Sequence, residues 1–368
     1  FSDVHITAIS QAPDGRRMSK SLGTGIDPLD LIGGGPRPPV FAEGSSAPGE
    51  FPAYGADAVR WGLLAMSSGQ DVRFSEDKVA QGQQLTNKLW NAARLILLGV
   101  GDDARPAATP TSVEDRWILS RLARARAELA GAIDRFDFSH AALGLYDFVY
   151  GELCDWYLEL VKPRLRAGEP ELSATLLHVL TETVALAHPL IPFETEEIYS
   201  HIPGAEGLLA ARVSPPGPAA ETGDGDGDAE AAVQRAIAAI QELRRWRNVN
   251  KIEAGAVLAA TLQAPGYDDT LAHIGRLARV DFGGGVDDGE PVAAVSIPNG
   301  RVQVFASPEV DATDAQARLQ ARRDQLGAEI ERAERKLANP GFVAKAPPAV
   351  VQAERDKLTR LRGELDAL

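Results

Sequence analysis

Cysteine and long apolar runs are the scarcest features of this 368-residue sequence. The single cysteine, Cys154, excludes a disulfide framework and a cysteine-rich zinc site. It follows Leu153 on a helical pattern, where a buried structural thiol is expected rather than a nucleophile. No run of about 18 apolar residues occurs, so no membrane-spanning helix is expected. Since no secretory signal pattern is found either, we expect a soluble cytoplasmic protein that does not bind membranes.

Aromatic residues and metal-ligand patterns are also sparse. Aromatic content is only 6%, whereas alanine and leucine are abundant, which favours helices. Four of the six histidines are scattered singly through the helical segments, so no protein-bound metal is predicted: His140, His178, His188 and His201.

Positive charge is in deficit, because the formal net charge is −14. Nucleic-acid binding usually needs a basic surface, so this balance is unfavourable for it. The distribution partly resolves the conflict. Residues 221–230 form an acidic stretch, whereas residues 313–368 hold 11 basic and 9 acidic side chains. Contact with RNA would therefore depend on local basic faces.

The most informative stretch, which we term the signature loop, spans residues 16–23: Arg16-Arg17-Met18-Ser19-Lys20-Ser21-Leu22-Gly23. It is basic and rich in hydroxyl groups, and turn-forming residues flank it. A lysine ammonium with neighbouring hydroxyls and backbone amides suits the phosphates of a nucleotide. Taken alone, such a short motif is more often a solvated basic loop.

The wider sequence gives the signature loop a context. Residues 17–21 resemble the KMSKS signature of class I aminoacyl-tRNA synthetases, with Arg17 in place of the first lysine. Further motifs typical of the valine, isoleucine and leucine group follow in order at residues 54–60, 87–94 and 155–159. Residues 337–348, with Asn339-Pro340-Gly341, are similar to the valyl-tRNA synthetases in particular. The resemblance covers nearly the whole chain.

Two features of that family have no counterpart here. The sequence contains neither a His-x-Gly-His-type motif nor a large editing domain, and it opens on a strand-like segment at residues 4–9. The resemblance therefore implies the carboxy-terminal part of a valyl-tRNA synthetase, inactive alone and without the amino-acid pocket.

The expected fold is mainly α-helical, with a small α/β unit and a carboxy-terminal antiparallel coiled-coil hairpin. The resemblance implies five parts: the end of a Rossmann-type catalytic domain at 1–70, a helical-bundle anticodon-binding domain at 71–214, an acidic linker at 215–228, a helix with the α/β unit at 229–310, and a coiled-coil tRNA-binding arm at 311–368. Residues 33–53 are an insertion rich in glycine and proline, which predicts a tolerated surface loop.

Periodicity and capping residues predict the individual elements. Helices are expected at 28–32, 54–66, 76–98, 113–133, from Ser139 to a stop at Pro163, at 172–187, from Thr195, at 229–247 and at 271–278. Strands are expected at 257–262, 279–282, 292–297 and 302–305. In the last hairpin, Leu319, Leu326, Ile330, Ala333 and Leu337 face a returning seam of Val351, Leu358, Leu361, Leu365 and Leu368, with Arg323 and Glu354 as misfits.

The resemblance implies roles for the signature loop in the complete enzyme. Lys20 would stabilise the charge that develops on ATP as valine attacks its α-phosphorus, and Arg17 would support the pyrophosphate. Met18, Ser19 and Ser21 complete the expected ATP-binding set. Mg²⁺ would accompany ATP, although its ligands are not legible in this sequence.

Basic and amide side chains are the candidates for tRNA contact, with a solvated surface as the alternative. They are Asn87, Lys88, Asn91, Arg94, Arg244, Arg245, Arg247, Arg332, Arg335, Lys336, Lys345 and Arg355. The implied partner is tRNA(Val), with valine and ATP bound through the missing half, and a monomer is expected. Two other hypotheses are the equivalent part of an isoleucyl- or leucyl-tRNA synthetase, and a stand-alone RNA-binding or coiled-coil protein. A zinc module rich in cysteine usually ends the isoleucine family, and one cysteine argues against it.

Overall fold

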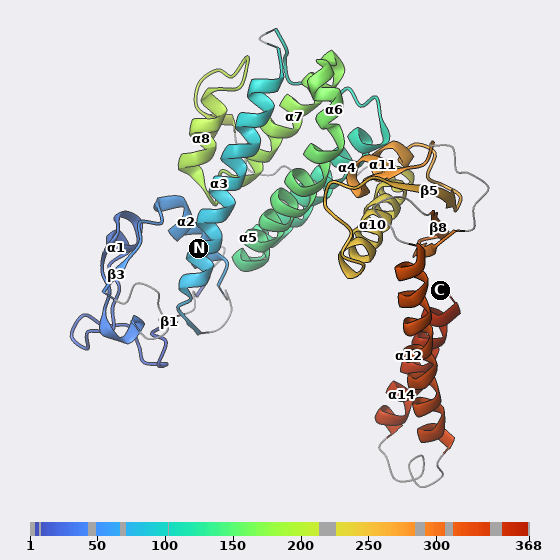
Figure 1. Ribbon diagram of the computed structural model, residues 1–368. Helices are drawn as coiled ribbons and strands as arrows, with labels where there is room; N and C mark the ends of the chain where they lie inside the picture. The colour runs from blue at the N-terminus through green and yellow to red at the C-terminus, as the bar shows by residue number, and fades with distance from the viewer. Residues whose placement is uncertain are drawn as a thin grey trace. The chain divides into compact units, whose positions relative to one another are not determined.

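The structure is a computed structural model that describes residues 4–6, 9–42, 49–66, 71–101, 103–212, 226–283, 291–305, 312–338 and 348–366. It divides into two compact units, Phe1–Glu230 and Ala231–Leu368, which are described separately. The protein is mainly helical with small sheets, as the sequence predicts (Figure 1). Within the described ranges, no helix has the length and apolar character needed to cross a membrane.

The amino-terminal segment is built from short elements. They are β1 (Ser10–Gln11), α1 (Pro28–Gly33), β2 (Gly35–Pro36), the 3-10 helix η1 (Pro39–Phe41), β3 (Glu50–Phe51), α2 (Ala56–Leu64) and β4 (Val72–Arg73). Strand β1 pairs in parallel with β4, and β2 pairs antiparallel with β3. The strand expected at residues 4–9 is misplaced: pairing begins at Ser10, and Val4 and Ile6 are exposed because the pairing with β4 does not extend to them.

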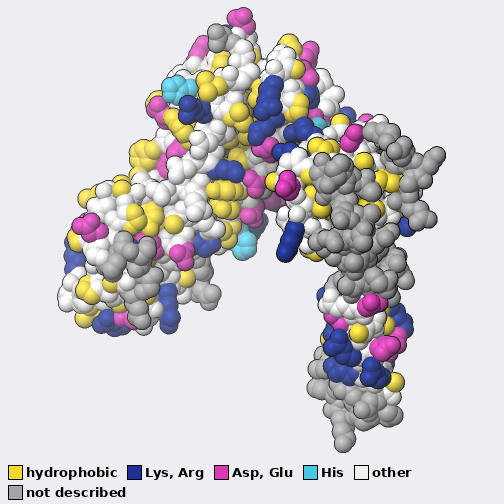
Figure 2. Space-filling view, in the orientation of Figure 1, with side chains coloured by type: hydrophobic (Ala, Val, Ile, Leu, Met, Phe, Trp, Pro, Cys, Tyr) yellow, Lys and Arg dark blue, Asp and Glu magenta, His cyan; other side chains and the backbone are white. Residues whose placement is uncertain are grey.

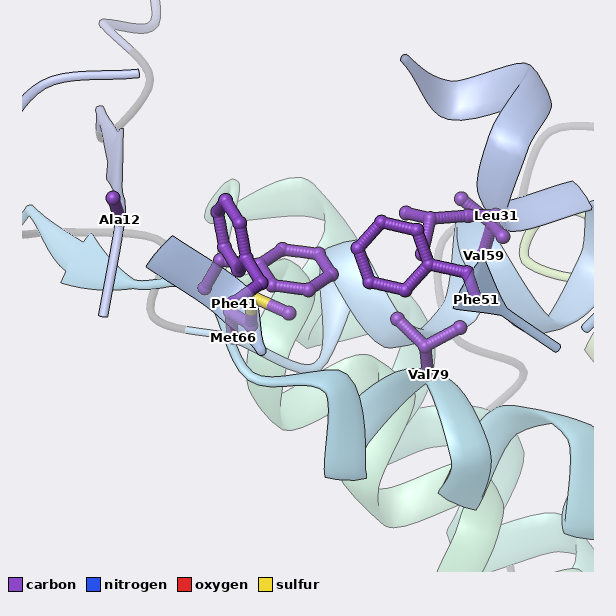
Figure 3. Packing of buried hydrophobic residues seen from close by; sticks show 8 residues of the cluster. Ala12, Leu31, Phe41, Phe51, Val59, Met66 and Val79 are labelled. Atoms are coloured by element: carbon purple, nitrogen blue, oxygen red, sulfur yellow. The ribbon is translucent and has the colours of Figure 1, made fainter. Parts of the chain in front are cut away.

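The prediction that residues 33–53 form a tolerated surface loop is wrong for the part that the structure describes. Phe41 and Phe51 are buried in one cluster with Leu31, Val59 and Val79 (Figure 3). The two phenylalanines supply the apolar area that burial requires, and the glycines and prolines only shape the turns around them. The insertion is therefore part of the core beneath α2.

A buried arginine of the insertion ties it to the next helix. Arg37 bonds through its guanidinium to both carboxylate oxygens of Glu76, with Nη2 2.8 Å from Oε1. The Tyr54 hydroxyl donates to the same Oε1 at 2.7 Å, and the guanidinium lies 4.2 Å from the centroid of the Phe51 ring. Arg37 holds the pKa of Glu76 below its usual range against the opposing effect of burial. Removing either partner would leave the other charge uncompensated in the interior.

A helical bundle fills the rest of the first unit. It comprises α3 (Glu76–Gly99), α4 (Val113–Asp134), α5 (Phe138–Asp147), the π-helix η2 (Phe148–Tyr157), α6 (Leu158–Ala167), α7 (Pro170–Ala187), α8 (Pro192–Ser200) and α9 (Leu209–Arg212). Ser75 caps α3 and Ser112 caps α4 through side-chain acceptors, which confirms both predicted starts. The apolar stripe expected on α3 is buried, from Leu85 to Ile96.

The helix bounds around Pro163 and Thr195 differ from the prediction. Pro163 lies inside α6, which continues to Ala167 and stops at Gly168, whose φ of 71° is left-handed. A proline removes one amide donor, but glycine in this conformation is the more effective terminator here. Asp137, not Ser139, caps α5, and α8 starts at Pro192 because proline suits the first helical turn.

Two glycines let α2 and α3 approach closely. A Cβ atom on Gly62 would lie 2.7 Å from the Val79 Cα, and one on Gly82 would lie 2.6 Å from the Ala58 carbonyl oxygen. Real side chains do not tolerate such distances, so the backbones would have to separate. Beside this contact, Trp61 of α2 is fully buried and donates to the Ala142 carbonyl at 3.1 Å. The face predicted for α2 is correct for Val59 and Met66 but wrong for Leu63, which is exposed.

The second unit holds a four-stranded sheet and a helical hairpin. Helix α10 (Gly227–Val249) leads into β5 (Leu258–Gln263), α11 (Leu271–Ala278), β6 (Val280–Asp281), β7 (Ala293–Ile297) and β8 (Gly300–Val304), in the sheet order β6-β5-β8-β7. Strands β5 and β6 are parallel and the other pairs are antiparallel. The predicted helix at 271–278 and all four predicted strands are confirmed within two residues at each end.

Helices α12 (Ala312–Ala338) and α14 (Pro348–Asp366) pack on each other through Leu326, Ile330 and Leu361. The seam is thus confirmed for these three residues and for Leu358, which packs against them, whereas Leu337 is half-buried outside that cluster. The side chains of Leu319, Arg323, Leu365 and Leu368 lie outside the described part. Glu354, a predicted misfit, is accommodated because its carboxylate lies 2.7 Å from the Lys336 Nζ.

The glycine contacts yield a first prediction. Gly82→Ala should lower the free energy of unfolding by about 1–3 kcal/mol, because its methyl group has no space beside Ala58. Gly144→Ala in α5 is the matched control, since nothing lies within 4 Å of where its Cβ atom would stand and a helical alanine should stabilise by about 0.5–1 kcal/mol. Urea unfolding of both variants measures the difference. Equal stabilisation by the two substitutions would contradict the close α2–α3 contact.

Candidate functional site

The signature loop is closed by backbone hydrogen bonds at its base. Ala12 N donates to the Arg16 carbonyl at 2.8 Å, and Gln11 and Arg17 form an isolated antiparallel bridge. Further along, Gly23 N donates to the Lys20 carbonyl at 3.2 Å. The loop thus follows β1 closely in the chain and is bonded to its end, which places the basic residues of the loop beside that strand.

Thr24 holds the loop together from inside. Its hydroxyl donates to the Arg17 carbonyl at 2.9 Å and accepts from Ser19 N at 3.1 Å, while its own amide donates to the Ser19 carbonyl at 3.2 Å. Only 1% of Thr24 is exposed. Thr24 was not predicted from the sequence as a functional residue, although a hydroxyl just after Gly23 was the available signal. Thr24 fixes the backbone on both sides of Met18.

The side chains of the signature loop divide into two sets. Met18 is half-buried and packs against the cluster that contains Phe41 and Phe51. Arg17 and Lys20 are exposed, and within the described ranges neither side chain makes a hydrogen bond or ion pair. The Ser19 and Ser21 hydroxyls lie 2.8 Å apart. The anchored methionine and the two uncommitted cations leave the charges available to an anionic ligand.

Arg16 contrasts with its two basic neighbours. Its Nε lies 2.6 Å from a carboxylate oxygen of Asp14, and its amide donates to the other oxygen at 3.0 Å. Those bonds lower the pKa of Asp14 and keep Arg16 committed to its own turn.

The four candidates on α3 have unequal surroundings. Lys88 pairs with Asp155 at 2.9 Å and lies 4.9 Å from the Tyr150 ring centroid, and the hydrogen bond to Asp155 raises its pKa. Asn91 donates to the Asn87 carbonyl at 2.7 Å. Asn87 and Arg94 are exposed, and within the described part of the chain the Arg94 guanidinium has no hydrogen-bond or ion-pair partner. Arg94 is therefore the least committed cation of this face.

The three arginines at the end of α10 also differ. Arg247 is only 7% exposed, and it donates to the carbonyl oxygens of Glu253, Ala256 and Arg279 at 2.7 to 3.3 Å. It therefore holds the second unit together and does not offer an RNA contact, which corrects that prediction. Arg244 and Arg245 remain exposed, with Arg244 Nε donating to the Leu277 carbonyl at 3.1 Å and Arg245 lying 3.3 Å from Glu242.

Basic side chains gather on the visible face of the α12–α14 hairpin (Figure 2). Arg332, Arg335 and Arg355 are exposed. Arg335 lies 3.3 Å from Glu331, and Lys336 pairs with Glu354. Lys345 lies outside the described residues. No group of three or more His, Cys, Asp or Glu side chains that could hold a metal ion occurs among the residues described.

Comparisons with known proteins indicate the class to which this chain belongs. Three family models match in order: tRNA synthetases class I (I, L, M and V) at residues 1–75, the anticodon-binding domain of tRNA ligase at 115–262, and the valyl tRNA synthetase tRNA binding arm at 311–368. These matches identify the protein as a class I aminoacyl-tRNA synthetase in part or whole.

Individual relatives narrow this assignment to one family within the class I aminoacyl-tRNA synthetases. A valine–tRNA ligase of Clostridium acetobutylicum is 33% identical over 100% of this chain and 41% of its own length, and one of Geobacter sulfurreducens is 34% identical with the same coverage. The chain belongs to the valyl-tRNA synthetase family, and it spans about two fifths of the length of these relatives. A crystal structure of an Agrobacterium radiobacter LeuRS–tRNA–LeuAMS complex matches 83% of this chain and 32% of its own chain at 16% identity, with a TM-score of 0.43.

The hydroxyl of Thr24 gives a second prediction. Thr24→Val should speed hydrogen exchange at the Ser19 amide by roughly tenfold, because that amide and the Arg17 carbonyl lose their partner, at a cost of about 1–3 kcal/mol. Thr24→Ser keeps the hydroxyl and should exchange nearly as the parent does. Mass-spectrometric exchange across residues 12–24 measures both. An unchanged rate in Thr24→Val would show that the hydroxyl does not hold the loop.

Proposed function

We propose that this chain is the part of a valine–tRNA ligase that supplies a KMSKS-type loop to valine activation and binds tRNA(Val). The role in valine activation is supported most directly by the way the side chains of the signature loop divide into an anchored set and an exposed set. Thr24 and Met18 anchor the loop, while Lys20 and Arg17 are exposed and unpaired in the described structure. An anchored loop carries its cations at a defined place, which is what electrostatic catalysis requires.

In the reaction we propose, the carboxylate of valine attacks the α-phosphorus of ATP and pyrophosphate leaves. The transition state spreads negative charge over the phosphate oxygens, so a cation held beside them lowers the barrier. Lys20 supplies that cation and Arg17 binds the departing pyrophosphate. Ser19 and Ser21 orient the loop through their hydroxyls and amides. Mg²⁺ accompanies ATP and neutralises part of its charge; no residue of this chain is assigned as its ligand.

The first step leaves valyl-adenylate, whose carbonyl carbon is then attacked by a hydroxyl of the terminal ribose of tRNA(Val); an ester forms and AMP leaves. The rest of the chain binds that tRNA. We assign anticodon recognition to the helical bundle and contact with the outer part of the tRNA to the α12–α14 hairpin. The support is the match of both regions to tRNA-binding family models, together with the exposed cations Arg94, Arg332, Arg335 and Arg355. Arginine suits this task because its guanidinium both pairs with phosphate and stacks on bases. A monomeric cytoplasmic enzyme remains our expectation from the sequence.

Substitution of Lys20 tests the catalytic half of the proposal. In the complete enzyme, Lys20→Ala should slow valine-dependent pyrophosphate exchange by roughly 10²-fold, or about 2.7 kcal/mol, because the developing charge loses its nearest cation. Arg16→Ala is the matched control: it removes a cation from the same loop, but one already paired with Asp14, so the exchange rate should change little. Similar losses in the two variants would mean that the loop acts through its net charge alone. A near-parental rate in Lys20→Ala would remove Lys20 from the mechanism.

A further inference from the structure

A small groove between α3 and α8 of the first unit has no part in the proposed chemistry. Its volume is about 250 Å³, and apolar side chains make most of its wall. Trp90, Ala93 and Leu97 line it from α3, and Ile198 lines it from α8. Ligand pockets for drug-sized molecules usually start at about 300 Å³, so this groove suits a single ring system instead.

The groove is bordered by apolar surface that the fold leaves uncovered. Trp90 is 41% exposed and Leu98 is 76% exposed, although both are large hydrophobic residues. Most apolar positions of α3 face the core, and Trp90 and Leu98 are exceptions together with Leu95, which is also exposed. Trp90 lines the groove and is partly exposed, so its aromatic ring is accessible to a ligand that stacks.

Polar groups stand on both sides of the hollow. Arg94 also lines it, and it lies one helical turn after Trp90, so the two are neighbours on the surface of α3. Its guanidinium has no partner in the described part of the chain. On the other side, the His201 Nε2 lies 3.2 Å from a carboxylate oxygen of Glu197. His201 lines the groove, and the other nitrogen of its imidazole can bond a polar atom of a ligand.

We infer that the groove between α3 and α8 binds one unpaired nucleobase of an RNA, stacked on Trp90. This inference rests on the proposed tRNA function and assigns one site within it. A base has a π-face that suits the tryptophan and a polar edge that suits the imidazole of His201. Arg94 can pair with the phosphate next to that base. Single-stranded RNA is recognised by this combination of an aromatic platform and an arginine.

The test measures binding of the 368-residue chain to the anticodon-arm hairpin of a valine tRNA, at one fixed salt concentration. A series of hairpins in which each loop nucleotide in turn lacks its base is compared in the parent and in Trp90→Ala. One abasic position should weaken binding to the parent about tenfold, the size expected for a stacked base. The same abasic position should cause no further loss in Trp90→Ala.

Phe193→Ala is the matched control. Phe193 is 66% exposed on α8 but does not line the groove, so this variant should keep the tenfold abasic penalty. Trp90→Phe keeps an aromatic face and should retain most of that penalty, which separates stacking from a loss of folding. Arg94→Gln should weaken all hairpins alike and reduce the salt dependence.

Two results would overturn the inference in distinguishable ways. Identical abasic penalties in the parent and in Trp90→Ala, with tight binding in both, would reject the groove as a base site and leave the proposed tRNA function standing. If the parent chain does not bind any hairpin or the whole tRNA, both the base site and the proposed RNA contacts of this chain fail.

Discussion

The close approach of α2 and α3, which two glycines permit, is the constraint on which the first unit depends. Gly62 and Gly82 leave no room for a methyl group between the helices. Because of that contact, the buried cluster beneath the signature loop is continuous with the start of the bundle, and Val79 of α3 belongs to it. At the same end of α3, the Glu76 carboxylate accepts hydrogen bonds from Arg37 and Tyr54. Near its start, helix α3 thus contributes to the cluster against which Met18 packs. Further along, the same helix carries Trp90 and Arg94.

Electrostatics explains how an acidic protein can still contact phosphates. The formal net charge is −14, and several cations in the described part of the chain have carboxylate partners, as Arg16 has Asp14 and Lys88 has Asp155. Exposed pairs of this kind contribute little to stability, and an anionic ligand has to compete with the carboxylate for the cation. Arg17, Lys20 and Arg94 face no such competition in the part that the structure describes. The proposals for the signature loop and for the groove at Trp90 therefore depend on these three cations rather than on net charge.

The sequence predicted best what local rules determine. Ser75 and Ser112 are caps because a hydroxyl followed by acidic residues satisfies the first amides of a helix, and both assignments are confirmed. The strands around β5 and β8 followed from β-branched and apolar patterning. The family resemblance came from motifs in a fixed order, and the family matches confirm it.

Predictions failed where distant residues decide the outcome. Composition marked residues 33–53 as a surface loop, yet Phe41, Phe51 and Arg37 find partners on α2 and α3 that composition does not show. Arg247 was placed with its exposed neighbours, but its orientation toward three carbonyl groups buries it. Thr24 escaped notice because its role is to bond backbone atoms five and seven residues away. The groove at Trp90 needs α8, about 100 residues further along, to become a site.

The central claim is that this chain contains the recognition part of a valine–tRNA ligase, and one binding comparison tests it most directly. Affinity is measured at one stated salt concentration for a valine tRNA transcript, the same transcript with a changed anticodon, and an unrelated tRNA. We expect the valine transcript to bind tightest, and changing the anticodon should remove most of that preference. Equal affinity for all three, or no binding, would contradict the claim.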